Sequence, residues 1–287
     1  MSVAQQGDLE IAYDIIGEGQ PWVITPGGRF SKDYGGVREM AEALAEHGKK
    51  VLIYDRLNCG ASSVCFAGAS ESEMQADSLA QLLRQLDFGP TVIIGGSGGA
   101  RISLLTAARH PDLARGLGIW WISGGVFGLM GLGQVYCAPS IMAAWSGTME
   151  DVANLDTWKE VMERNPKNRE HFLSYDPAEF KATMERWMHV YCGCGDPLVP
   201  GLTDEQVAGI NFPILVFRSG KADPHHTRET SQRVAAGLPG ARLVEPPWGD
   251  REWLDRGEMR NRGEGTIFSG WYQLVPQLIE WANETIG

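Results

Sequence analysis

Segments of strand length and segments of helix length alternate along most of this chain, and this alternation limits the fold more than any other feature. Apolar runs such as LEIAYDI at 9–15, WVIT at 22–25 and KVLIYD at 50–55 are followed by amphipathic stretches such as VREMAEALAEHG at 37–48. Parallel strands need long connections, so strands that alternate with helices predict an α/β domain with a mostly parallel sheet. We expect residues 9–15 to form an edge strand.

The alternation stops in the middle of the chain. Residues 126–205 have no strand and helix rhythm and are rich in Trp, Met and Tyr, and the buried-strand pattern resumes only at FPILVFRSG, residues 212–220. A length of 287 residues suits one domain with an insertion. We therefore predict a core built from residues 1–125 and 206–287, with residues 126–205 inserted into it.

One long stretch, residues 116–149, contains no charged residue. This length raises the question of a membrane-spanning helix. Eight glycines and one proline interrupt the stretch, which disfavours a continuous spanning helix. The pattern instead favours a buried strand at 117–122 that runs into a glycine-rich loop over a pocket.

A serine lies between two glycine pairs at the junction of a predicted strand and a predicted helix. The stretch VIIGGSGGARIS, residues 92–103, fits the pattern G-x-S-x-G around Ser97. In this context the pattern indicates a nucleophile elbow, a sharp turn with positive φ that tolerates only small neighbours. A passive glycine turn and a phosphate loop are the alternatives, but Ala100 and Arg101 stand where a phosphate loop needs Lys followed by Ser or Thr.

These segments together resemble the α/β-hydrolase family over nearly the whole chain. Pro26-Gly27-Gly28 is similar to the family's oxyanion loop, YDRLNCGAS at 54–62 to its D-x-x-G-x-G-x-S turn, and FPILVFRSGKADP to the strand that delivers an acid, here Asp223. The resemblance implies an α/β-hydrolase fold, with a mostly parallel central sheet flanked by helices and an inserted helical cap. It also implies that the backbone N–H groups of Gly28 and Gly98 stabilise an oxyanion, while Arg29 could reach a substrate carboxylate or carbonyl.

The sequence departs from the family at the base. The family order is Ser, Asp and then His after the last strand, but here Gly249-Asp250 follows the predicted strand ARLVEPP, and no histidine lies beyond His226. The sequence therefore places Asp250 where the general base normally sits, and an ordinary Ser-His-Asp order cannot be assumed.

Two histidines lie near the predicted catalytic loop. His225 and His226 follow Asp223 by two and three residues, and a serine hydroxyl needs a base of near-neutral pKa to become a nucleophile. We predict that His226 takes the proton of Ser97 and that Asp223 or Asp250 holds it, with His225 also at the pocket. In the insertion, we expect Trp187 to line an apolar substrate site.

The predicted function is hydrolysis of a small hydrophobic ester, lactone or carbon–carbon (ketone) substrate through Ser97. One alternative is a lyase or isomerase on the same fold, in which His226 and Asp250 move protons. Another is a ligand-binding protein without catalysis. No cofactor is expected, and no metal either, because the spacing of His189, Cys192 and Cys194 is not that of a zinc site.

Charge and cysteine content limit the partners. The net charge of −11 disfavours nucleic acid and anionic membrane surfaces, so we expect a small-molecule substrate and leave a homo-oligomer open. The start MSVAQQGDLE has no secretory pattern, and five cysteines form no disulfide framework. These features favour a cytoplasmic protein.

Overall fold

A mostly parallel sheet forms the centre of the protein in a computed structural model, which describes residues 1–192 and 197–287. Within these residues the sheet has eight strands in the order β1-β2-β4-β3-β5-β6-β7-β8. Strands β1 and β2, and likewise β2 and β4, pair antiparallel, and all the other neighbours pair parallel. The strands are β1 Ser2–Gln6, β2 Leu9–Ile16, β3 Gln20–Thr25, β4 Lys49–Tyr54, β5 Thr91–Gly96, β6 Ala114–Trp120, β7 Ile214–Phe217 and β8 Ala241–Val244.

The expectation of an edge strand at residues 9–15 is wrong. This segment is β2, the second strand of the sheet, because β1 pairs along it from Ser2 opposite Tyr13 to Gln6 opposite Leu9. The sequence SVAQQ of β1 is mostly polar and largely exposed. An exposed edge strand of this kind leaves no apolar run to detect.

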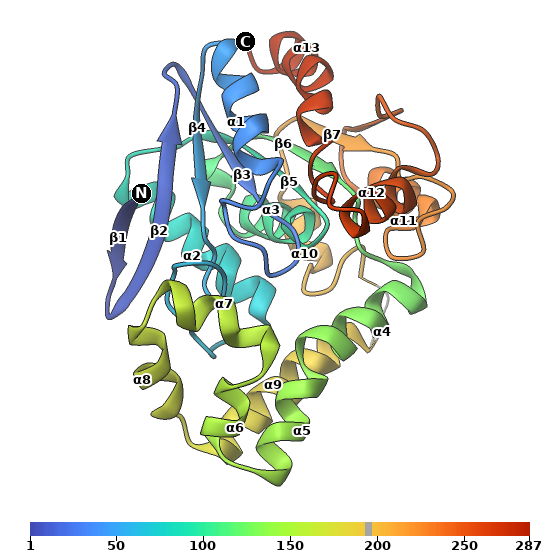
Figure 1. The fold of residues 1–287 in the computed structure, drawn as a ribbon. Helices are drawn as coiled ribbons and strands as arrows, with labels where there is room; N and C mark the ends of the chain where they lie inside the picture. The colour runs from blue at the N-terminus through green and yellow to red at the C-terminus, as the bar shows by residue number, and fades with distance from the viewer. Residues whose placement is uncertain (193–196) are drawn as a thin grey trace.

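Helices cover both faces of the sheet, because successive strand side chains point to opposite faces. Val23 belongs to the apolar cluster under α2, α3 and α11, whereas Ile24 belongs to the cluster under α1 and α13. Figure 1 shows the helices around the sheet. These core helices are α1 Val37–Glu46, α2 Glu71–Gln85, α3 Gly98–Arg109, α10 Asp204–Ala208, α11 Arg228–Gly237, α12 Glu252–Asn261 and α13 Val275–Thr285, with short 3₁₀ segments η1 Pro111–Leu113 and η2 Trp271–Leu274.

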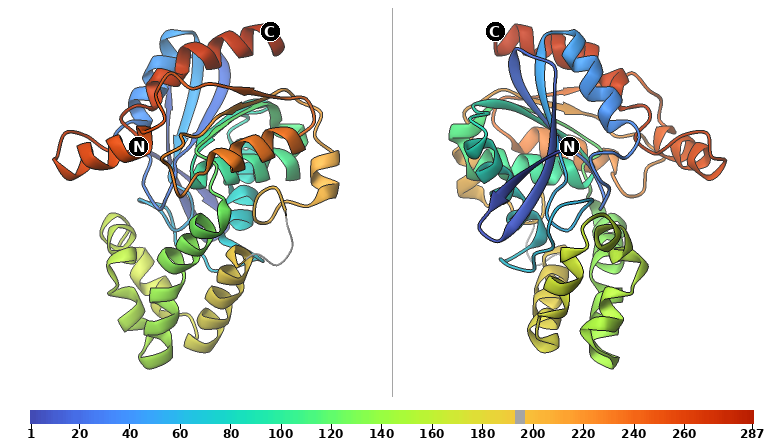
Figure 2. Two further views of the ribbon diagram at one scale, coloured as in Figure 1. Left: turned by 90° about the vertical axis from the view of Figure 1, so that its right-hand side faces the viewer. Right: turned by 60° about the vertical axis from the view of Figure 1, so that its left-hand side comes forward.

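A second group of helices, here called the helical insertion, leaves the sheet at the carboxyl end of β6. It comprises α4 Gly125–Tyr136, α5 Ala138–Ser146, α6 Met149–Ala153, α7 Asp156–Arg164, α8 Lys167–Leu173 and α9 Pro177–Tyr191. The insertion has an apolar core of its own, which includes Trp158, Phe172 and Trp187 and takes in Phe66 from the core domain. Figures 1 and 2 show it as a separate layer beside the sheet.

The predicted glycine-rich loop after residue 122 is also wrong, because residues 125–146 form α4 and α5. Glycines of α4 allow close packing rather than a loop: a Cβ on Gly128 would lie 2.5 Å from the carbonyl oxygen of His225, and one on Gly133 would lie 3.3 Å from Met188. By length and composition alone, Gly125–Ser146 is long and apolar enough to cross a membrane, and 22% of its most apolar 18-residue window is buried in the structure.

Candidate active site

Ser97 lies in the sharp turn between β5 and α3. Its φ of 59° and ψ of −126° are in a strained region for a residue with a side chain. The neighbouring glycines are needed for space, since a Cβ on Gly95 would lie 2.6 Å from the Gly99 carbonyl oxygen, and one on Gly99 would lie 2.0 Å from that of Thr25. The turn projects the half-buried Ser97 beyond the carboxyl ends of the parallel strands.

A chain of hydrogen bonds connects Ser97 to His226 and Asp223. Ser97 Oγ lies 2.8 Å from His226 Nε2, and His226 Nδ1 lies 2.9 Å from Asp223 Oδ2. Both Asp223 and His226 are buried. With the imidazole proton on Nδ1 and donated to the carboxylate, Nε2 is free to accept the proton of the serine hydroxyl.

The loop between β7 and α11 fixes this arrangement. Asp223 Oδ1 accepts the backbone N–H groups of His225 at 3.0 Å and His226 at 2.9 Å, which is the local turn that an Asp side chain stabilises. Thr227 then caps α11, with its hydroxyl accepting the N–H of Thr230 at 3.2 Å. The acid therefore positions the backbone of the base as well as its ring.

Two tryptophans that the sequence reasoning missed form walls around His226. The ring of Trp121 is stacked at 6.0 Å and that of Trp253 lies edge-on at 4.6 Å. Trp121 has a φ of 48° at the end of β6, an unusual conformation for a bulky residue. In sequence, neither tryptophan stood out from the other eight.

The predicted oxyanion donors lie next to Ser97. Gly28 has a φ of 55°, and a Cβ on Gly98 would lie 3.4 Å from the Gly28 nitrogen. The Gly28 nitrogen thus lies close to Gly98, which follows Ser97 and begins α3, where the helix end favours negative charge. The buried Arg56, missed in sequence, donates to the carbonyl oxygens of Gly27 at 3.2 Å and Gly28 at 2.6 Å.

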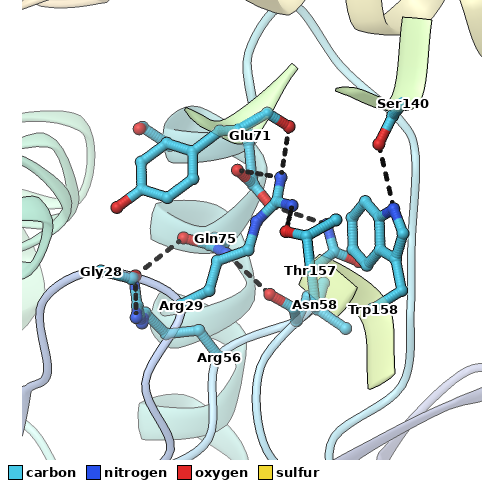
Figure 3. A network of polar contacts seen from close by, with 12 residues as sticks. Gly28, Arg29, Arg56, Asn58, Glu71, Gln75, Ser140, Thr157 and Trp158 are labelled. Carbon is cyan, nitrogen blue, oxygen red and sulfur yellow. Dashed lines mark hydrogen bonds and ion pairs between the residues drawn. The ribbon is translucent and has the colours of Figure 1, made fainter. Parts of the chain in front are cut away.

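Arg29, which the sequence suggests could reach a substrate carboxylate or carbonyl, contacts the helical insertion and α2 in the structure. It donates to Glu71 Oε2 at 3.2 Å, to the Tyr136 carbonyl at 3.2 Å and to Thr157 Oγ1 at 3.3 Å, and its guanidinium lies 4.2 Å from the ring centre of Trp158 (Figure 3). Burial lowers the pKa of Arg29, but the Glu71 carboxylate outweighs burial and the net pKa is raised. Arg29 therefore links the loop of Gly28 to α2 and the insertion.

Asp250 lies in an ion-pair cluster, contrary to the expectation that it would sit with the reacting residues. Its carboxylate binds Arg218 at 3.1 Å and also Arg228. Its backbone oxygen accepts the N–H of Ala222 at 3.1 Å. The physical reason is charge: the two arginines hold the carboxylate, while His226 Nδ1 is already bonded to Asp223.

Trp187 and His225 occupy different environments. Trp187 is 1% exposed within the apolar core of the insertion, so the structure places it inside that core, whereas the sequence suggested a lining residue of the substrate site. His225 is half-buried beside Phe127 and Trp253. Burial lowers the pKa of His225, and the neighbouring His226 lowers it further.

No group of three or more potential metal ligands occurs within residues 1–192 and 197–287. His189 and Cys192 are exposed there, and Cys194, the third member of the group weighed in the sequence, lies outside the described residues.

Comparison with known proteins agrees with this architecture. A family model described as the alpha/beta hydrolase fold matches residues 21–117. The enol-lactonase of Burkholderia xenovorans LB400 superposes with a TM-score of 0.59, at 20% identity over 98% of this chain and 100% of that one. A thermophilic esterase of Thermogutta terrifontis gives a TM-score of 0.60, at 20% identity over 99% and 97%.

A relative in sequence is a protein of Mycobacterium phage D29, provisionally named a non-heme haloperoxidase, which is 31% identical over 103 residues. This match spans only 36% of either chain. The family match over residues 21–117 and the superpositions agree that this chain has the α/β-hydrolase fold.

Proposed function

We propose that this protein is a serine hydrolase that acts on an ester or lactone, with Ser97 as nucleophile, His226 as base and Asp223 as the acid that orients it. The observation that carries the proposal is the continuous chain from Ser97 Oγ to His226 Nε2 at 2.8 Å and from His226 Nδ1 to Asp223 Oδ2 at 2.9 Å. This is the arrangement that activates a serine hydroxyl.

The chemistry follows from the positions of these groups. His226 Nε2 takes the Ser97 proton as Oγ attacks the substrate carbonyl carbon, and the carbonyl oxygen becomes an oxyanion held by the N–H groups of Gly28 and Gly98. When the carbon–oxygen bond to the leaving group breaks, His226 gives its proton to the departing alkoxide and an acyl-serine remains. Water, deprotonated by His226, then attacks the acyl-serine; the bond from the carbonyl carbon to Ser97 Oγ breaks, His226 returns the proton to Oγ, and the acid is released.

The helical insertion supports the same proposal as a cap over the site. It begins directly after β6, and its helix α4 packs against the loop of His225, as the 2.5 Å approach of a Cβ on Gly128 to the His225 carbonyl indicates. The rings of Trp121, Trp253 and Phe127 around the histidine pair suit a substrate with an apolar part. Lactone and ester substrates are also named for the enol-lactonase and the esterase with this fold.

A fluorophosphonate probe tests the proposal, since it reacts covalently with an activated serine. We expect one label per chain at Ser97, located by mass spectrometry, and none in Ser97→Ala. Ser123→Ala, which removes a buried serine near the end of β6, is the matched control and should label normally. A folded protein that binds or converts a carbonyl compound without labelling would contradict the proposal and favour the lyase or the ligand-binding alternative.

A further inference from the structure

Three arginines of the core converge on the amino-terminal end of α2. They come from three separate loops or helices, and each donates to a side chain in the first two turns of α2: Arg29 to Glu71 at 3.2 Å, Arg101 to Ser72 at 2.9 Å and Arg56 to Gln75 at 3.5 Å. Figure 3 shows Arg29 and Arg56 reaching toward the side chains of this helix. We call these three residues the arginine cluster.

The arginine cluster is buried and carries surplus positive charge. Arg56 and Arg101 are each 3% exposed. Among the described ion pairs, Glu71 is the carboxylate that joins the cluster, through Arg29. The amino-terminal end of α2 adds a further partial positive charge. Buried cations are costly unless they are paired, so this region favours an additional anion.

Each arginine of the cluster also has a buried N–H group without an acceptor in the structure. These groups are Arg29 Nε, Arg56 Nε and Arg101 Nη1. Arg29 is paired with Glu71, and Arg56 has three acceptors, whereas Arg101 donates to two uncharged hydroxyls, those of Ser72 and Tyr191. Its planar guanidinium retains the donor geometry that suits a carboxylate.

The arginine cluster lies on the opposite side of Ser97 from the base. Along the sheet, the order is β4, β3, β5, β6 and β7, and the loops after these strands carry Arg56, Gly28, Ser97, Trp121 and then His226. Arg101 lies one helical turn after Ser97 on α3. The leaving group must lie beside His226, which protonates it, and the oxyanion must lie at Gly28 and Gly98, so the acyl part of a substrate takes the remaining direction, away from the base.

We propose that the acyl part of the natural substrate carries a carboxylate and that Arg101 binds it. This inference rests on the proposed function, and it names the substrate class of the same site: esters or lactones of dicarboxylic acids. The bound carboxylate supplies both the missing negative charge and an acceptor for the unpartnered Nη1 group.

Two p-nitrophenyl esters of equal chain length provide the test. The hexanoyl ester ends in a methyl group, and the mono-adipoyl ester ends in a carboxylate at the same position. We expect the wild type to prefer the adipoyl ester in kcat/KM by at least about tenfold, the effect of one charge-assisted hydrogen bond. Arg101→Met should remove this preference through KM, and Arg101→Lys should restore part of it.

Arg109→Met is the matched control, because Arg109 lies on the same helix and is paired with Asp77, so the ratio of the two esters should not change. A wild type that prefers the hexanoyl ester, with a ratio that Arg101→Met leaves unchanged, overturns the inference while the hydrolase proposal stands. If neither ester is cleaved and Ser97 is not labelled, the hydrolase proposal fails. In that case, the change in Tm caused by free adipate tests the inference. A higher Tm of the wild type that is lost in Arg101→Met supports carboxylate binding by Arg101. No change in the Tm of the wild type overturns it.

Discussion

Asp223 and His226 are three residues apart on one loop, and the Asp223 carboxylate holds both the ring of His226, at 2.9 Å, and its backbone N–H, also at 2.9 Å. One side chain thus fixes the tautomer, the ring orientation and the backbone of its partner. In most arrangements of this chemistry, the acid and the base come from separate loops. Here a single turn between β7 and α11 carries both.

Asp223→Asn is expected to reduce kcat/KM by on the order of a thousandfold or more, because an amide can hold the imidazole in the wrong tautomer. Asp250→Asn is the matched control. It removes a carboxylate that binds Arg218 and Arg228, so activity should stay within about tenfold. Ester hydrolysis by the two purified variants decides the point. Equal losses would mean that Asp250 also orients the base.

His226→Gln should lower both ester hydrolysis and the rate of fluorophosphonate labelling by on the order of a thousandfold, because the Ser97 hydroxyl then has no base within hydrogen-bond reach. His225→Gln should cost less than about tenfold, since His225 contributes only its backbone N–H to Asp223. Rates of labelling followed by mass spectrometry compare the two. A larger loss in His225→Gln would reassign the base.

Trp187→Ala should lower the free energy of unfolding by about 3–5 kcal/mol, because it opens a cavity in the core of the helical insertion. Trp145→Ala, at an exposed tryptophan of the same insertion, should change it by less than about 0.5 kcal/mol. Urea unfolding followed by far-UV circular dichroism measures both. If Trp187→Ala leaves the free energy of unfolding unchanged but alters KM, Trp187 contacts the substrate as the sequence predicted.

Stability should depend on pH through Asp14. Burial disfavours the Asp14 carboxylate, but hydrogen bonds from groups such as Lys32 outweigh it and lower its pKa to about 2 from the usual 3.8. A carboxyl with a depressed pKa stabilises the fold above its unfolded pKa, and this contribution is lost as the pH falls from about 4 toward 2. Asp14→Asn should therefore have a lower Tm than the wild type at pH 7 and no deficit near pH 2. A pH-independent difference would contradict this assignment.

Local sequence signals predicted the sheet and the serine turn. The glycines around Ser97 are required by close contacts within the turn itself and with the adjoining strand. The short pattern G-x-S-x-G is therefore enough to predict the turn. The contact between His226 and Asp223 was also predictable, because the two residues lie only three positions apart in the chain. When two residues in contact are also close in sequence, the local sequence pattern is enough to predict their contact.

Long-range contacts account for what the sequence could not predict. Asp250 drew attention through its place after the last strand, but its partners, Arg218 and Arg228, lie more than twenty residues earlier in the chain. Arg56, in the loop after β4, contacts the loop of Gly27 and Gly28 after the neighbouring strand β3, and nothing close to Arg56 in the sequence indicates that contact. In α4, glycines that look like helix breakers instead permit close packing.

Because the loop from Asp223 to His226 carries both the acid and the base, the segment after β8 carries neither. Since acid and base both precede α11, the segment that follows β8, including α12, contributes a wall residue, Trp253, but none of the groups that we propose exchange a proton. Exposed positions in this segment, such as Gly263, are then sites where evolution can lengthen the chain or where an engineer can attach a reporter, with the proton relay left intact.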